Sequence, residues 1–84
     1  MRHARPAALD ELEPLLQRIR ALPGLTEKAR GVFYAKSKAF LHFHEDPAGL
    51  FADARLGDDF DRFRVQTAEE QAALVGLLFK LLGV

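Results

Sequence analysis

The sequence predicts one small α+β domain built in two layers, with the element order α-β-β-β-β-α. An N-terminal and a C-terminal helix are expected to flank an antiparallel β-meander of three to four strands. Three observations predict this class: apolar residues recur every three or four positions near both ends, they alternate from residue 32 onward, and turn and cap signals separate the segments. A chain of 84 residues can bury one hydrophobic core, so residues 1–84 are expected to form a single domain.

The composition excludes several classes of function. Twelve Lys and Arg balance twelve Asp and Glu, so no overall positive field draws the chain to nucleic acid or to an anionic membrane. The absence of cysteine rules out disulfides, thiolate nucleophiles and cysteine zinc sites. Acidic residues interrupt the N-terminal segment where a secretory signal would be apolar, and the apolar C-terminal stretch is too short to span a bilayer. We therefore expect a cytoplasmic protein without a membrane partner.

The N-terminal helix is predicted from apolar side chains that share one face between residues 7 and 22. Pro14 lies inside this pattern, and a proline costs about 3 kcal/mol in a helix interior but is tolerated in the first turn. The helix therefore either begins near residues 12–13 or is kinked at Pro14. The Pro23-Gly24 pair ends it. The apolar face consists of Leu9, Leu12, Leu15, Leu16, Ile19 and Leu22.

Turn signals set the register of the strands that follow. The best signal is Asp46-Pro47-Ala48-Gly49, which has Asp first, Pro second and Gly fourth, as a type I turn prefers. Ser37-Lys38 is taken as a tight turn before it, and Gly57-Asp58 as a turn after it. These turns predict strands at residues 32–36, 39–45, 50–55 and 60–66, whereas residues 25–31 fit either a short edge strand or an irregular connection.

With these turns, the side chains of the meander sort into two faces. The apolar face, which is expected to receive the helices, carries Val32, Tyr34, Leu41, Phe43, Leu50, Ala52, Ala54, Phe63 and Val65. The opposite face, which mixes aromatic and titratable groups and is the predicted binding face, carries Phe33, Phe40, His42, His44, Phe51, Asp53, Arg55, Phe60, Arg62 and Arg64.

The C-terminal helix has a distinct start signal. Thr67 and Glu70 have the spacing of a capping box, in which the threonine hydroxyl and the glutamate carboxylate each accept a backbone N–H. Gly83 ends the helix. A wide apolar stripe is expected to cover the sheet beside the first helix, formed by Leu74, Val75, Leu77, Leu78, Leu81 and Leu82.

A histidine pair on the third predicted segment raises the question of a metal site. His42 and His44 stand two apart on a strand, so both rings leave the same face with Cα atoms roughly 6.5 to 7 Å apart. The register places Asp53 opposite His42 as a third candidate ligand. Arg62, however, lies beside Asp53, where a salt bridge would occupy the carboxylate. A structural ladder of His42, Asp53 and Arg62 is therefore favoured over a metal site, and no cofactor is expected.

The same face predicts two further alternatives. Exposed phenylalanines flanked by arginines are typical of sheets that stack single-stranded bases and bind their phosphates. Covering of these phenylalanines by a partner subunit, a loop or the N-terminal segment is favoured over nucleic acid, because the net charge is zero. The pair of His42 and Asp53 has no identified nucleophile, so no catalytic residue is assigned.

Two family resemblances follow from motif order. Gly31-Val32-Phe33, the run at residues 38–44 that ends in His-Phe-His, and the capping box after residues 60–65 resemble a small bacterial luciferase-domain family of unknown function. Leu22-Pro23-Gly24-Leu25, followed by a strand-turn-strand with Lys38 and Phe40, is more loosely similar to the MmcQ/YjbR-like proteins. Both resemblances imply an α+β topology, and neither implies an activity.

Together these observations predict a non-catalytic binding or interaction protein. It would associate with itself, or bind a ligand, through the predicted binding face. The alternative is a nucleic-acid-binding module on the same face. A metal protein or an enzyme that uses His42 and His44 ranks third.

Overall fold

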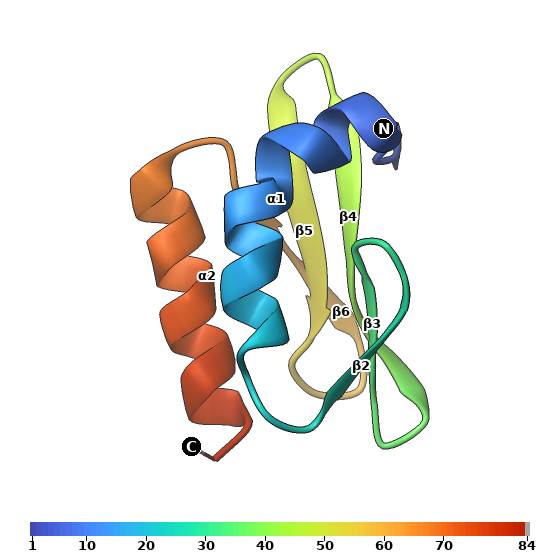
Figure 1. Cartoon of the computed structure of the whole chain (residues 1–84), viewed down its shortest axis with the longest axis vertical. Coiled ribbons are helices and arrows are strands. Elements are labelled where there is room, and N and C mark those ends of the chain that lie inside the picture. Colours follow the sequence, from blue (N-terminus) through green and yellow to red (C-terminus); the bar gives the residue numbers. More distant parts are fainter. Residues whose placement is uncertain (84) are drawn as a thin grey trace.

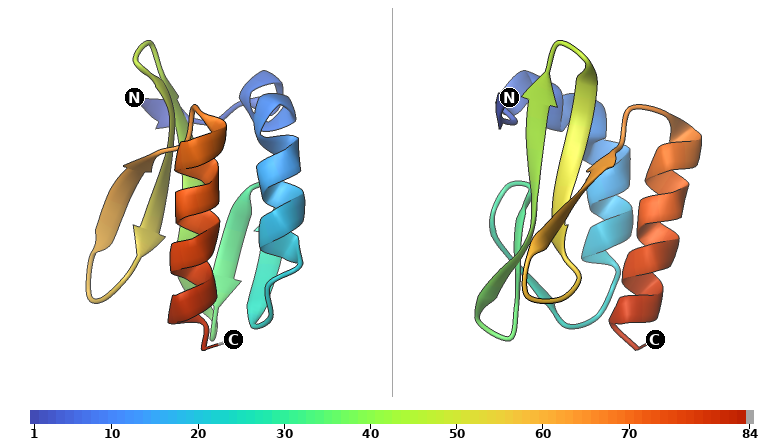
Figure 2. Two further views of the ribbon diagram at one scale, coloured as in Figure 1. Left: turned by 90° about the vertical axis from the view of Figure 1, so that its left-hand side faces the viewer. Right: turned by 180° about the vertical axis from the view of Figure 1, so that it is seen from behind.

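The computed structural model describes residues 1–83 and confirms the two-layer α+β class. Two helices lie side by side on one face of a single antiparallel sheet (Figures 1 and 2). The opposite face of the sheet has no helix over it. The elements are β1 (Arg2–His3), α1 (Pro6–Arg20), β2 (Leu25–Ala29), β3 (Val32–Ala35), β4 (Lys38–Asp46), β5 (Gly49–Arg55), β6 (Phe60–Arg64) and α2 (Ala68–Leu81).

The sheet contains more strands than the sequence predicts. The meander has the order β2-β3-β4-β5-β6, so residues 25–29 form the edge strand that was one of two alternatives. The two-residue strand β1 was not foreseen, and it also pairs with β4. One edge of β4 is thus shared, because β3 pairs with its first part and β1 pairs with its last part. This sharing brings the N-terminal residues onto the sheet.

Helix α1 begins earlier than expected. Pro6 is its first residue. The N–H groups of the first helical turn have no acceptor within the helix, so a proline, which lacks this group, is tolerated there. The helix continues through Pro14 to Arg20. The alternative start near residues 12–13 is therefore wrong. Figure 1 shows the first turns of α1 tilted against the remainder of the helix. A bend of this kind is expected where a proline removes one hydrogen bond of the helix.

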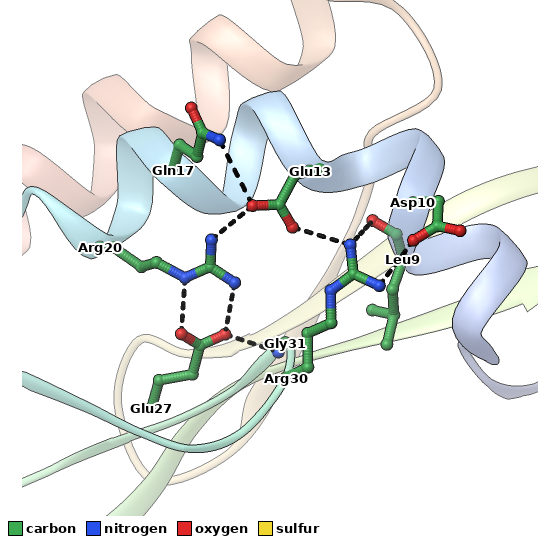
Figure 3. Close-up of polar contacts among 8 residues, drawn as sticks. All are labelled: Leu9, Asp10, Glu13, Gln17, Arg20, Glu27, Arg30 and Gly31. Carbon is green, nitrogen blue, oxygen red and sulfur yellow. Dashed lines mark hydrogen bonds and ion pairs between the residues drawn. The ribbon is translucent and has the colours of Figure 1, made fainter.

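An ion network fastens α1 to the hairpin of β2 and β3 (Figure 3). Arg20 donates to Glu13 at 2.6 Å and to Glu27 at 2.6 and 3.1 Å. Arg30 reaches back from the hairpin turn to Glu13 at 2.8 Å and to Asp10 at 2.7 Å. Glu13 therefore stands between two guanidinium groups, whose hydrogen bonds lower the pKa of its carboxyl to about 2.

Replacing Glu13 should change how stability depends on pH. The pKa of Glu13 is about 2 in the folded protein and about 4.3 in an unfolded chain, so its contribution is present above pH ~4.3 and is lost as the pH falls toward 2. In Glu13→Gln we expect a lower free energy of unfolding at pH 7 and a flatter decline between pH 5 and 2.5. Urea unfolding across this range measures it, with Glu11→Gln on the same helix as the control. An identical decline in Glu13→Gln and the wild type would contradict the assignment.

The core lies between the helices and the sheet. Leu12, Leu15, Leu16 and Ile19 of α1 are fully buried against the middle strands, and Leu74 and Leu78 are the buried residues of α2. The predicted apolar stripe of α2 is thus only partly used, since Leu81 is exposed. Within residues 1–83, neither helix has the length and apolar composition needed to cross a membrane. The capping box of Thr67 and Glu70 is confirmed, with both reciprocal hydrogen bonds present.

The register of β3 against β4 differs from the prediction. The turn lies at Lys36 and Ser37, one residue earlier than expected, and both residues adopt positive φ angles of 52° and 69°. A bulge follows, so that Phe33 pairs with Leu41 and no residue of β3 is left opposite Phe40. A shift of one residue moves every side chain of a strand to the other face. Phe33 and Phe40 consequently belong to the core, at 1% and 9% exposure, and not to the predicted binding face.

The same shift affects the predicted core positions of β3. Val32 and Tyr34 are only half-buried and are not part of the core cluster. Tyr34 instead has the Lys28 ammonium 4.8 Å from the centre of its ring. In contrast, the register of β4, β5 and β6 is as predicted, with His42 opposite Asp53 and Asp53 opposite Arg62.

Candidate metal centre

The face of the sheet that no helix covers carries eight of the ten predicted binding residues. The register forms rows that run across β4, β5 and β6. One row is His44, Phe51 and Arg64, the next is His42, Asp53 and Arg62, and the last pairs Arg55 with Phe60. The other two, Phe33 and Phe40, lie in the core. The face is therefore less aromatic than the sequence suggests, and its centre is polar.

A third histidine, which sequence reasoning did not include, completes a cluster on this face. The ring of His3 lies 4.8 Å from that of His44 and 5.8 Å from that of His42, and the rings of His42 and His44 are 4.9 Å apart, measured between centroids. One ring nitrogen from each histidine can be chosen so that all three lie within 4.8 Å of one another. The chain has three histidines, so all of them meet at this one place.

His3 reaches the cluster because β1 pairs with the last part of β4. His3 is the direct register partner of His44. The chain just after β1 is fixed by the Ala4 N–H, which donates to the Phe43 carbonyl at 3.0 Å. Arg5 adds two hydrogen bonds to the Glu45 carboxylate, one from its backbone N–H at 2.7 Å and one from its guanidinium at 2.9 Å. These hydrogen bonds to β4 thus fix the chain beside His3.

Three ring nitrogens of this cluster are buried without a hydrogen-bond partner among residues 1–83. They are Nδ1 of His42 and both Nδ1 and Nε2 of His44. Buried polar atoms are nearly always paired, because an unpaired one costs about 1–3 kcal/mol. A neutral imidazole nitrogen without a donor nearby presents a lone pair, which is what a metal ion binds. The unpaired nitrogens of His42 and His44 are therefore candidate ligand atoms for a metal ion.

The electrostatic environment keeps part of the cluster neutral. Burial lowers the pKa of His42, and the neighbouring His44 lowers it further, so His42 is uncharged at neutral pH. Asp53 is only 7% exposed and accepts hydrogen bonds from Arg62 on both oxygens, at 2.7 and 2.9 Å. This guanidinium holds the pKa of the Asp53 carboxyl below its usual range. Asp53 and Arg62 thus form a charge pair beside the neutral His42 imidazole.

The dimensions of the cluster suit a small metal ion. In a tetrahedral site with metal–nitrogen bonds of about 2.0–2.1 Å, two ligand nitrogens lie about 3.3 Å apart and two ring centres about 5 Å apart. The ring centres already have this spacing. The nitrogens, within 4.8 Å, require only that the rings turn, and the exposed position of His3 leaves room for this movement.

Asp53 does not take the place of the third ligand that the sequence considered. Its two oxygens are engaged by Arg62, which is the competition that the predicted register anticipated. The third candidate ligand, His3, lies on β1, about forty residues away in sequence. Pro6 favours an extended conformation only at Arg5, which lies outside β1, so it does not signal the strand. Nothing in the local pattern indicates which strand would receive it.

The arginines of this face are all used within the chain. Arg62 binds Asp53, and Arg64 binds Glu70 at 3.2 Å. Arg55 donates to the Ala39 carbonyl at 2.9 Å and lies 4.5 Å from the centre of the Phe60 ring. Few cationic groups therefore remain for phosphates.

Comparison with family models, with curated proteins and with solved structures finds no match to this chain. The resemblances to the luciferase-domain family and to the MmcQ/YjbR-like proteins stay predictions.

Proposed function

We propose that this protein binds one divalent transition-metal ion through His3, His42 and His44. The observation that carries the proposal is the convergence of all three histidines on the open face of the sheet, where Nδ1 of His42 and Nδ1 of His44 are buried without a hydrogen-bond partner among residues 1–83. Three protein ligands leave one position for a water molecule or another small ligand.

The donor atoms decide the class of metal. Imidazole nitrogens suit zinc, copper, nickel and iron, whereas magnesium and calcium require oxygen ligands. The chain has no cysteine, so the soft thiolate ligands that select monovalent copper are absent. Zn²⁺ is the reference ion for this donor set, and Co²⁺ can report on it by its absorption.

This proposal narrows the hypothesis of a binding face. A general binding or self-associating surface was expected to use phenylalanines, but Phe33 and Phe40 are buried on the helix side. A nucleic-acid surface would need free cations, and the arginines of the face are engaged. A metal ion would instead use ring nitrogens of this face that have no hydrogen-bond partner among residues 1–83.

The test is a titration of protein without a histidine tag with Zn²⁺ by calorimetry and with Co²⁺ by visible absorption. We expect one metal per chain. His3→Ala, His42→Ala and His44→Ala should each lower the affinity by more than the ~10–100-fold that the loss of an outer hydrogen-bonding partner costs.

The matched control is Asp61→Asn, which removes an exposed carboxylate from β6, a strand that carries none of the three histidines. It should bind metal as the wild type does. Absence of saturable binding by the wild type, or affinity that survives each histidine substitution, would refute the proposal.

A further inference from the structure

Asp53 connects the histidine cluster to Arg62. Its Oδ2 atom lies 3.1 Å from Nε2 of His44, and both of its oxygens accept hydrogen bonds from the Arg62 guanidinium. The His44 ring is close enough for a hydrogen bond to Oδ2 but is not turned to give one of good angle, since Nε2 remains without a partner. A rotation of the ring would align them.

We infer that Asp53 is a positioning residue that holds the proton of His44 on Nε2 and thereby presents Nδ1 to the metal. The inference rests on the metal-binding function proposed above and names the atom through which one ligand acts. A carboxylate accepts hydrogen bonds and donates none, so the nitrogen that faces it must carry the proton. Nδ1 of His44 is the other buried nitrogen without a partner, and its lone pair is then free.

The arrangement follows a general rule of metal sites. A histidine ligand commonly donates its second ring N–H to a carboxylate, which fixes the tautomer and the orientation of the ring. Asp53, whose Oδ2 atom lies 3.1 Å from Nε2 of His44, stands in the position of such a carboxylate.

Arg62 makes Asp53 suited to this role. Its two hydrogen bonds fix the carboxylate plane, so the remaining lone pairs of Oδ2 point in a set direction. They also make Asp53 a poor direct ligand, because a metal would have to compete with the guanidinium for the same oxygens. Asp53 thus acts through His44 and does not bind the ion.

The first test reads the tautomer by ¹⁵N–¹H correlation of the three histidines. In the metal-free wild type at slightly alkaline pH, we expect His44 to be protonated on Nε2, and in the Zn²⁺ form to be bound through Nδ1. In Asp53→Asn, the amide oxygen is expected to face Arg62 and the NH₂ group to face His44, which moves the proton to Nδ1. A purely structural role for Asp53 would not move the tautomer.

The second test compares affinities. Asp53→Asn should weaken Zn²⁺ binding by about 10–100-fold, whereas Asp61→Asn should leave it unchanged. Zn²⁺ bound through Nε2 of His44, or an Asp53→Asn protein that keeps both its tautomer and its affinity, overturns the positioning role while metal binding stands. A wild type that binds no Zn²⁺ overturns the proposed function itself, and the metal-free tautomer still reports whether Asp53 orients the ring.

Discussion

Zn²⁺ at one hundred times its dissociation constant is expected to raise the melting temperature of this protein by roughly 10–20 °C. A ligand at that concentration stabilises the folded state by about 2.7 kcal/mol. A domain of 60–100 residues shifts by about 4–8 °C for each kcal/mol, because its unfolding entropy is small. Circular dichroism during heating, with and without Zn²⁺, measures the shift.

The control for this shift is the triple variant His3→Ala, His42→Ala, His44→Ala, which has no histidine left. It should melt at the same temperature with and without Zn²⁺, and a chelator should return the wild type to its metal-free midpoint. A comparable rise in the triple variant would show that Zn²⁺ stabilises the fold through other groups, against the proposal.

Phe33→Ala is expected to lower the free energy of unfolding by about 3–5 kcal/mol, as deletion of a fully buried phenylalanine does. Phe33 is 1% exposed and belongs to the core beneath the helices. An 84-residue domain has about 4–13 kcal/mol of stability in total, so this variant should lose a large part of it. Urea unfolding at pH 7 measures the loss.

Phe60→Ala is the matched substitution on the open face. Phe60 is only half-buried and packs edge-on against His42, with ring centres 4.9 Å apart, so its loss should cost well under half as much. The comparison decides the register of β3 and β4. If the turn lay at Ser37-Lys38, both phenylalanines would lie on the open face. Equal losses of unfolding free energy in the two variants would support that register over the observed one.

The two halves of the sheet differ in how well the sequence predicts them, and the reason is turn chemistry. At Asp46-Pro47-Ala48-Gly49 the Asp46 carboxylate accepts the Ala48 N–H at 3.1 Å, and Gly49 adopts a φ of 134° that favours glycine. These residue types predict the turn, so the pairing of His42 with Asp53 could be derived from it.

At Lys36 and Ser37 the same reasoning fails. Both residues adopt left-handed conformations that asparagine and glycine would signal and that lysine and serine do not. No residue type in the sequence signals the bulge next to this turn either. An error of one residue was enough to place Phe33 on the wrong face.

His3 could not be predicted because two residues are too few to show a periodicity. Its partner strand lies about forty residues away, and pairing at that distance is decided by the assembled fold and not by local pattern. Only the pair of His42 and His44 was visible in advance. Two histidines with Asp53 as the nearest further ligand favour a structural ladder, whereas three imidazoles favour a metal site.

The divided edge of β4 has a consequence for solubility. Where β3 ends, β1 and Ala4 cover the backbone groups of residues 43–45 that would otherwise form an open strand edge. Open edges recruit strands from other molecules and start aggregation. An ion that joins His3 to β4 would keep β1 paired with β4, so loss of the metal would also expose a strand edge that promotes aggregation. A preparation of this protein that has lost its metal would then contain more aggregated protein.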